Sequence, residues 1–303
     1  MVVIEFRAWE RWLLPKLVPN AHLIRLGVDD TVDSLFSRIL ALSPAPSDVM
    51  FHVNLTEPGR MPRNRPELLD RLEAAGYRCW NGRVASIAKS EVQKRNLEAG
   101  LPSTMLGPGQ PEDRVMVKSN LNAFGRVERA LSEAERLAYG LPDYQSLPGF
   151  EDGDYPVMLR KDVPAEWWSN KDLFIERYVD NSSGEFFRVQ FIGERVVLFT
   201  GRSSQPVRRL KVASDRRNYL VTTEFVSGPK SLKLPEELRA VLRTAVTVAK
   251  TSGLDYGSID LNADDEGRVF AIDVNPTPHW GGDIDPVLLN HMQAGLRVAA
   301  APS

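Results

Sequence analysis

Short apolar runs and helical spacings alternate over the first part of the chain. Four apolar runs have the length of buried strands. These runs are residues 2–6, 21–28, 48–55 and 77–80. Between them, residues 31–42 and 66–76 carry apolar side chains at helical spacing, the first with Thr31 or Asp30 as N-cap. Strands that alternate with helices predict an open α/β lobe over residues 1–85.

The segment 86–180 predicts a second lobe. Residues 86–100 have helical spacing and a capping box, for which Ser86 is the more natural N-cap and Ser90 the alternative. Residues 114–118 form an apolar strand that leads into a polar loop ending at Gly125. Further strands are predicted at residues 155–159 and 173–179, and a surface loop rich in Pro, Gly and Asp at residues 140–153.

The remaining segment, 181–303, combines two hairpin patterns with the clearest helix of the chain. The predicted hairpins pair residues 185–192 with 195–200 and residues 256–263 with 268–274. Residues 234–253 have an apolar stripe at helical spacing, acidic residues in the first turn and a closing glycine. Strands beside a long helix predict a third lobe.

Two carboxylates are expected to meet in the second hairpin. Side chains alternate between the faces of a strand, so folding about the turn brings Asp260 close to Asp273, with Asn275 at the strand end. Adjacent carboxylates repel each other and need a cation or a shared proton. Oxygen ligands favour Mg²⁺ or Mn²⁺, with phosphate oxygens and water completing the shell. The alternative is a surface hairpin with exposed acids, although an unpaired carboxylate in an apolar strand is costly.

The composition narrows the class of protein. Hydrophobic residues make up 43% and charged residues 26%, as in soluble globular proteins. The net charge of −2 provides no overall field that attracts nucleic acid or an anionic membrane. The single cysteine, Cys79, excludes an internal disulfide and a cysteine-based zinc cluster. Because the N-terminus carries charges and no long uncharged apolar run is present, we expect a cytoplasmic protein without a signal peptide or a membrane span.

The acidic hairpin also resembles a known motif. Its sequence is Gly257-Ser-Ile-Asp260, followed after a gap by Asp273-Val-Asn275-Pro276. This pattern resembles the metal-binding segment of the ATP-grasp superfamily, in which the matching residues bind two Mg²⁺ ions that bridge the phosphates of ATP. The resemblance implies an ATP-grasp fold of α+β lobes, with Asp260, Asp273 and Asn275 as metal ligands. The family usually has Glu at the second position, so Asp273 is a departure.

Two lysines upstream match nucleotide-binding positions of this family. Lys89, in a predicted helix, resembles the first nucleotide-binding lysine of D-alanine–D-alanine ligases. Lys118, at the end of an apolar strand, resembles the second, which contacts the α- and β-phosphates, and Gly125 would let the following loop approach phosphate closely. Arg160 and Lys161 follow another apolar strand and compete with Lys118 for this role. The alternative without a functional role is, for each lysine, a solvated surface charge.

The segment that begins at Glu176 resembles the adenine hinge of the family. The resemblance implies that Glu176 and the backbone near Tyr178 and Val179 hydrogen-bond the base. Glu185 matches the ribose-binding carboxylate, with two extra residues in between. A surface charge on a hairpin is the alternative for Glu185.

Basic residues between the two predicted hairpins are candidates for the γ-phosphate or an acyl-phosphate. The family places a Lys or Arg in this region, and such a charge stabilises a transferring phosphoryl group. We expect Arg202 and Lys211 to have this catalytic role. D-alanine ligases also carry an Arg two residues before the first metal-binding Asp, where this chain has Ser258, which argues against that particular enzyme.

Substrate contacts are expected on two loops. The segment after Asn275 lines the acceptor site in relatives, so His279 and Trp280 are candidates. Arg60 and Arg63 lie on a basic loop of the N-terminal lobe, and guanidinium groups suit a carboxylate or a phosphate. Local packing or simple exposure is the alternative for all four residues.

Together these features predict an ATP-dependent carboxylate–amine ligase that acts through an acyl-phosphate. Its cofactors would be ATP and Mg²⁺, with Mn²⁺ as a substitute, and its partners a small-molecule carboxylate and an amine. Neither nucleic acid nor membrane is expected as a partner, and a homodimer is possible in this family. The alternatives are a small-molecule kinase on the same fold and a non-catalytic nucleotide-binding module.

Overall fold

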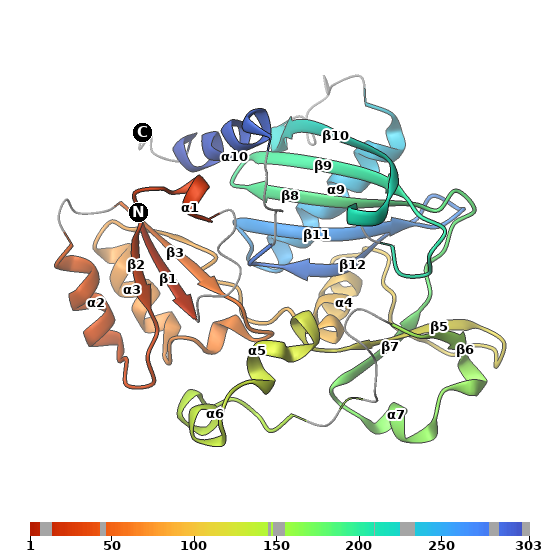
Figure 1. The fold of residues 1–303 in the computed structure, drawn as a ribbon, viewed down its shortest axis with the longest axis horizontal. Coiled ribbons are helices and arrows are strands. Elements are labelled where there is room, and N and C mark those ends of the chain that lie inside the picture. Colours follow the sequence, from red (N-terminus) through yellow and green to blue (C-terminus); the bar gives the residue numbers. More distant parts are fainter. Residues whose placement is uncertain are drawn as a thin grey trace.

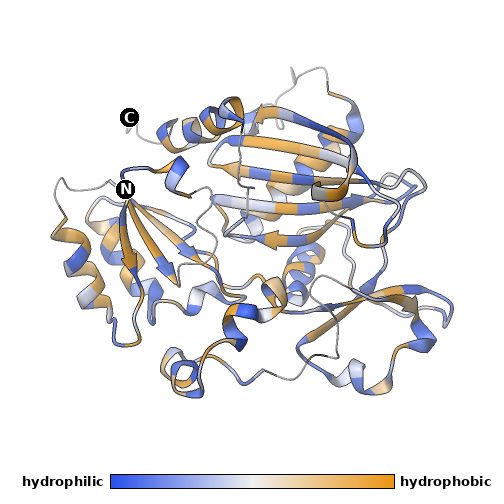
Figure 2. Ribbon diagram, viewed as in Figure 1, coloured by the Kyte–Doolittle hydropathy of each residue, from blue (hydrophilic) through white to orange (hydrophobic). Residues whose placement is uncertain are grey.

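The computed structural model describes residues 1–6, 14–42, 47–144, 147, 155–208, 210–224, 234–278 and 285–298. Three sheets organise these residues and follow one another along the chain, over residues 2–80, 114–177 and 185–275 (Figure 1). The strands of the two larger sheets are mostly hydrophobic, with polar residues between them (Figure 2). No helix in the described part of the chain combines the length and the apolar character needed to cross a bilayer.

The N-terminal sheet is parallel, with the order β2-β1-β3-β4. Its strands are β1 (Val2–Phe6), β2 (His22–Arg25), β3 (Asp48–Val53) and β4 (Arg78–Trp80). The connections include α1 (Leu14–Leu17), α2 (Val32–Leu40), η1 (Pro58–Arg60) and α3 (Arg65–Ala74). Thr31 caps α2 through a capping box with Ser34, which confirms the predicted helix start. The short helix α1 has no counterpart in the sequence prediction.

The middle sheet is antiparallel, with the order β6-β5-β7. Its strands are β5 (Arg114–Ser119), β6 (Val157–Leu159) and β7 (Leu173–Arg177), with η3 (Arg160–Asp162) and α7 (Ala165–Ser169) before β7. The chain leaves β5 through η2 (Asn122–Gly125), α5 (Arg126–Arg129) and α6 (Glu133–Tyr139). These elements pack on the N-terminal lobe, where Tyr139 meets Phe6 edge-on at 5.1 Å between ring centroids.

The C-terminal sheet is antiparallel, with the order β10-β9-β8-β11-β12. Its strands are β8 (Glu185–Ile192), β9 (Arg195–Arg202), β10 (Ser214–Thr222), β11 (Tyr256–Ala263) and β12 (Val269–Asn275), with η4 (Leu210–Val212) before β10. Helix α9 (Glu236–Thr251) covers one face through an apolar stripe. Helix α10 (Pro286–Val298) packs on the other face, near α1 (Figure 1). Both predicted hairpins are confirmed.

Helix α4 (Lys89–Glu98) begins three residues later than Ser86, so the predicted capping box at Ser86 is wrong. The Ser86 hydroxyl instead accepts from the N–H of Ala88 at 3.2 Å. The free N–H groups of the first helical turn are met by a residue that follows β5, because Asn120 accepts from Lys89 N at 3.2 Å and from Ser90 N at 3.0 Å. Helix α4 packs against β12 and α9 of the C-terminal lobe.

The N- and C-terminal lobes share a hydrophobic core. Its members include Val3, Met50 and Trp80 from the first lobe and Ile192, Val197, Tyr256 and Met292 from the last. Gly295 of α10 lies against the backbone of β8, where an added Cβ would stand 2.1 Å from the Ile192 carbonyl oxygen. The helix therefore approaches the strand as closely as only glycine allows.

Replacing Gly295 with alanine is expected to lower the free energy of unfolding by about 1–3 kcal/mol, because α10 must move off the sheet. Urea unfolding measures the change. Gly107→Ala is the matched control, since an added Cβ there meets no atom within 4 Å. Equal stability of the two variants would contradict this account of the contact.

Candidate functional site

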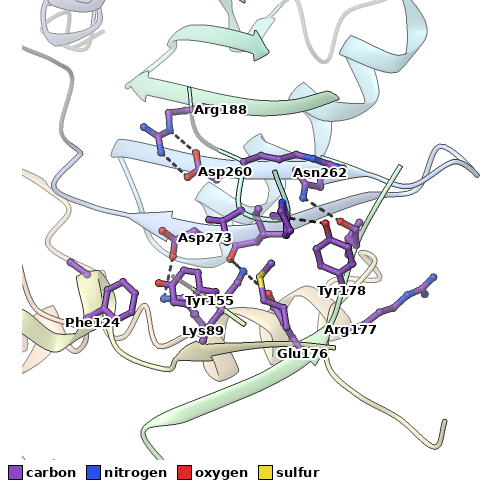
Figure 3. A pocket seen from close by; sticks show the side chains of 18 of the residues that line it. Lys89, Phe124, Tyr155, Glu176, Arg177, Tyr178, Arg188, Asp260, Asn262 and Asp273 are labelled. Carbon is purple, nitrogen blue, oxygen red and sulfur yellow. Dashed lines mark hydrogen bonds and ion pairs between the residues drawn. The ribbon is translucent and has the colours of Figure 1, made fainter. Parts of the chain in front are cut away.

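A cavity of about 470 Å³ lies where the middle and C-terminal lobes face each other (Figure 3). Its walls come from α4, β5, η2 and β7 on one side and from β8, β11 and β12 on the other. The charged residues that line it are Lys89, Lys118, Arg126, Arg177, Arg188, Arg208, Glu176, Asp260 and Asp273. Six of these are cations and three are acids, so the cavity suits an anionic ligand.

Lys118 reaches the cavity from the end of β5. Its ammonium forms an ion pair with Glu176 on β7 and donates to the Ile272 carbonyl of β12 at 3.4 Å. The second carboxylate oxygen of Glu176 accepts from the Thr104 hydroxyl at 2.5 Å. Lys118 and Glu176 are both buried. A solvated surface charge is therefore excluded for Lys118, and this lysine joins the two walls of the cavity.

Lys89 enters the same cavity from the first turn of α4. Its ammonium lies 3.4 Å from Asp273 Oδ1 and donates to the Leu121 carbonyl at 3.2 Å. The side chain is 6% exposed, whereas that of Asp273 is 40% exposed. Both predicted lysines are thus buried and directed into one space, as expected for residues that bind an anion there.

The two aspartates of the acidic hairpin stand directly opposite each other. Asp260 on β11 pairs in register with Asp273 on β12, which confirms the predicted proximity. On its other side Asp260 pairs with Arg188 of β8. The Arg188 guanidinium donates to both carboxylate oxygens, with Nε–Oδ1 at 2.5 Å and Nη2–Oδ2 at 2.7 Å (Figure 3). The Asp260 carboxylate raises the pKa of Arg188 and outweighs the opposing effect of burial, and Asp273 adds to the rise, so the guanidinium stays charged.

The donor set around this hairpin fits a hard cation. Two carboxylates and the Asn275 amide supply only oxygen atoms, which Mg²⁺ and Mn²⁺ prefer. The described residues contain no group of three or more His, Cys, Asp or Glu that could hold a metal by itself. A metal here would take further ligands from phosphate and water, as Mg²⁺ usually does.

The candidate adenine hinge borders the cavity at the other end. Tyr178 and Val179 both line the cavity. The Tyr178 N–H donates to the Arg114 carbonyl at 3.1 Å, and its ring lies under the Arg114 guanidinium at 4.5 Å. Asn262 of β11 donates to the Val179 carbonyl at 3.5 Å. The hinge is thereby fixed to both lobes.

Comparisons with known proteins identify the fold. No protein-family model matches the chain, and no curated protein matches its sequence. The ATP-grasp ligase PsnB, complexed with a minimal precursor, Mg and ADP, aligns with a TM-score of 0.50 at 14% identity over 98% of each chain. A RiPP-associated ATP-grasp ligase of Chryseobacterium gregarium, in complex with ADP and a leader and core peptide, aligns with a TM-score of 0.50 at 11% identity over 99% of this chain and 97% of that one. The chain has the ATP-grasp fold.

Several predicted residues lie elsewhere in this ATP-grasp fold. Glu185 begins β8 and is absent from the described cavity lining. Arg202 ends β9, exposed and likewise outside that lining. Asn275 turns its amide oxygen to Thr277, whose N–H donates at 2.8 Å. Lys211 is placed only by its backbone in η4, so its side chain lies outside the described residues, as do His279 and Trp280.

Arg60 and Arg63 contact backbone rather than the ATP-grasp cavity. Arg60 donates to the Gly140 carbonyl and Arg63 to the Leu137 carbonyl, each at 3.1 Å. Both contacts fasten the end of α6 to the N-terminal lobe. In the described structure neither arginine lines the cavity between the other two lobes.

Sequence reasoning missed other residues that line the cavity. Phe124 stacks on Tyr155 with ring centroids 4.9 Å apart and an interplanar angle of 10°. Ala123 and Phe124 both have positive φ, 44° and 61°, which is a strained backbone for residues other than glycine. Arg188 lies on a strand that the sequence predicts, 185–192. The sequence does not show that this strand pairs with β11, so the contact between Arg188 and Asp260 was not predicted.

A buried polar junction anchors η2 and α5 of the ATP-grasp middle segment. Glu128 accepts from the Thr56 N–H at 2.6 Å, and the Thr56 hydroxyl accepts from Asn122 N at 2.8 Å. Asn122 also donates to Asn54 Oδ1 at 3.0 Å. Burial raises the pKa of Glu128, although hydrogen bonds from Thr56 oppose the rise. The protonated carboxyl is thus favoured by folding.

Glu128→Gln is expected to gain stability relative to the wild type as the pH rises. A carboxyl whose folded pKa lies above its unfolded value stabilises the fold below the unfolded pKa and loses that contribution as the pH rises through the folded pKa. The neutral amide keeps the acceptor for Thr56 and avoids this loss. Urea unfolding at pH 4.5 and pH 8, with exposed Glu98→Gln as control, measures the difference. A pH-independent difference would refute the assignment.

Proposed function

We propose that the protein is an ATP-dependent ligase that joins a carboxylate to an amine through an acyl-phosphate. The observation that carries the proposal is the convergence of buried Lys89 and Lys118 with the register pair Asp260 and Asp273 on one cavity between two lobes. The cationic excess of the lining complements a triphosphate, and the paired carboxylates complement its metal.

Roles follow from position around the cavity. Lys89 and Lys118 would bind phosphate oxygens, and Tyr178 and Val179 would border the base. Glu176 would hydrogen-bond the base and keep its ion pair with Lys118, and Glu185 remains a proposal for the ribose. Arg202 and Lys211 remain proposals for the γ-phosphate, for which Arg126 and Arg208 are further candidates because both line the cavity.

Asp260 and Asp273, with Asn275, would hold Mg²⁺ or Mn²⁺. The metal would neutralise negative charge on the phosphates and orient them for in-line transfer. The protein's part is to exclude water from the cavity and to set its cations against the triphosphate before reaction.

The chemistry consists of two displacements. A carboxylate oxygen of the first substrate attacks the γ-phosphorus, the bond to the β,γ-bridging oxygen breaks, and ADP leaves. The amine nitrogen of the second substrate then attacks the acyl carbon and loses a proton, and the carbon–oxygen bond to phosphate breaks. The products are an amide, ADP and phosphate. None of these displacements requires a nucleophile from the protein.

The fold comparisons support the substrate class without naming a substrate. The two solved structures reported above are described as ligases, one complexed with a minimal precursor, Mg and ADP and the other with ADP and a leader and core peptide. We therefore propose amino acids and short peptides as the first substrates to test. A cytoplasmic location, a homodimer and the division into lobes 1–85, 86–180 and 181–303 belong to the same proposal.

An ADP-release assay against pools of amino acids and dipeptides tests this function. We expect ADP and phosphate only when a carboxylate and an amine are both present, with a product mass equal to the sum of the substrates less one water. A stable phosphorylated product would identify a kinase instead. Nucleotide binding without turnover in any pool would identify a binding module.

A further inference from the structure

Every acidic residue of the described cavity lining is already paired with a cation from the protein. Asp260 is held by Arg188, Asp273 by Lys89 and Glu176 by Lys118. The pairs come from different elements, so the cavity holds an interlocking set of charges from both lobes. Arg126, Arg177 and Arg208 add further positive charge. A free divalent cation would therefore approach a lining whose carboxylates are neutralised.

The Arg188–Asp260 pair is the most complete of the three. Its two hydrogen bonds occupy both carboxylate oxygens in the fork geometry that makes such pairs strong. The side chains are 32% and 26% exposed, so the pair is neither free in solvent nor sealed from it. A metal that takes both Asp260 oxygens from the side that the guanidinium occupies must displace at least one of these hydrogen bonds. The guanidinium then needs another anion, and a triphosphate in the same cavity supplies one.

Arg188 lies on the same face as a position where the sequence departs from D-alanine ligases. Ser258 stands where D-alanine ligases carry an arginine, two residues before the first metal-binding Asp. Ser258 pairs in register with Gln190, and Asp260 pairs with Arg188, so both positions lie on the face that carries Asp260. The neighbouring strand β8 thus brings the Arg188 guanidinium to the Asp260 carboxylate, on the same face as Ser258.

We propose that Arg188 is a positioning residue. Its hydrogen bonds to the Asp260 carboxylate block divalent metal from this carboxylate until the triphosphate of ATP is bound. On this account the phosphates draw the guanidinium away, and the freed carboxylate oxygens become metal ligands. Metal and nucleotide then bind with positive coupling, and each raises the affinity for the other by the same factor. The inference rests on the proposed function, because it requires a triphosphate in this cavity.

Mn²⁺ binding to the purified full chain tests the proposal. In the wild type, Mn²⁺ alone should bind at least tenfold more weakly than Mn²⁺ with a non-hydrolysable ATP analogue. Arg188→Gln should bind Mn²⁺ alone at least tenfold more tightly than the wild type, and the coupling to nucleotide should shrink by the same factor. Titration calorimetry or the Mn²⁺ resonance signal measures both quantities without turnover.

Matched variants distinguish two effects of replacing Arg188: loss of the hydrogen bonds that block Asp260, and loss of one positive charge from the cavity. Arg208→Gln removes another cation of the cavity, one that pairs with Asp180 and touches neither metal candidate, so its affinity for Mn²⁺ alone should stay within twofold of the wild type. The double variant Arg188→Ser with Ser258→Arg returns a guanidinium to the side of Asp260 and should restore weak binding of free Mn²⁺. If Arg188→Gln fails to fold, Arg188→Lys, which cannot occupy both oxygens in the fork geometry, should bind Mn²⁺ alone at least threefold more tightly.

Equal affinity of Arg188→Gln and the wild type for Mn²⁺ alone would overturn the proposal, as would equal gains in Arg188→Gln and Arg208→Gln. In the fallback case, unchanged affinity of Arg188→Lys would do the same. Failure of the proposed function looks different. A wild type that couples Mn²⁺ to nucleotide, with the expected response to Arg188→Gln, but releases no ADP would retain this inference and lose the ligase.

Discussion

Replacing Asp273 with asparagine is expected to lower the kcat of ADP release by about 100- to 1,000-fold at saturating ATP, the scale found when one preorganised oxyanion-hole donor is removed from an active site. The amide keeps the shape of the side chain but removes the negative charge opposite Asp260 that would hold the metal. Lys89 would also lose its partner at 3.4 Å. Steady-state kinetics across a Mg²⁺ titration measure the effect.

Glu266→Gln is the control for this variant. It removes a carboxylate from the exposed turn of the same hairpin, 70% exposed and paired only with Arg268 at the surface among the described residues. Its kcat should stay within about twofold of the wild type, since exposed ion pairs contribute little. An Asp273→Asn enzyme with full activity at high Mg²⁺ would remove the hairpin from the catalytic site.

Lys118→Met is expected to destabilise the fold by about 3–5 kcal/mol, because it leaves the buried Glu176 carboxylate without its cation. The same change should weaken the binding of ADP, measured by calorimetry, since a cation of the cavity is lost. Urea unfolding measures the first effect separately from the second.

The double variant Lys118→Met with Glu176→Gln divides these two effects. A neutral amide keeps an acceptor for Thr104 and needs no counter-ion, so most of the lost stability should return. Nucleotide affinity should stay low, because the cation is still absent. Recovery of both quantities together would show that Lys118 serves stability alone.

The acidic hairpin was predictable because its determinants are local. The turn sets the register between β11 and β12 as far as Leu261 and Ala271, and a register shift between Leu261 and Asp260 then places Asp260 opposite Asp273. Folding about the turn therefore predicts that the two aspartates lie close together, but the sequence pattern does not predict the shift. The position of Arg188 depends on the pairing of β8 with β11. These two strands are neighbours in the sheet, but β9, β10 and α9 lie between them in the sequence. Strand order over such a separation leaves no signal in the residues themselves.

The start of α4 shows the same limit. Ser86 has the right chemistry for an N-cap, and a local pattern can say no more. The first turn is satisfied instead by Asn120, which follows β5 at the far side of an intervening segment. The packing of α5 and α6 on the N-terminal lobe could not be predicted either. The apolar residues Val127 and Leu131 indicate burial, but the sequence does not show which surface covers them.

That packing has a consequence for how the cavity between the middle and C-terminal lobes can open. The middle sheet continues into the C-terminal lobe through the hinge after β7, and it is also bound to the N-terminal lobe through Glu128, Asn122 and the apolar side of α5. Because the middle sheet is attached to both other lobes, it cannot move away from the C-terminal sheet without changing its contact with the N-terminal lobe. Access to the cavity is thereby tied to the contact between the first and second lobes, whose residues Thr56 and Glu128 do not line the cavity in the described structure.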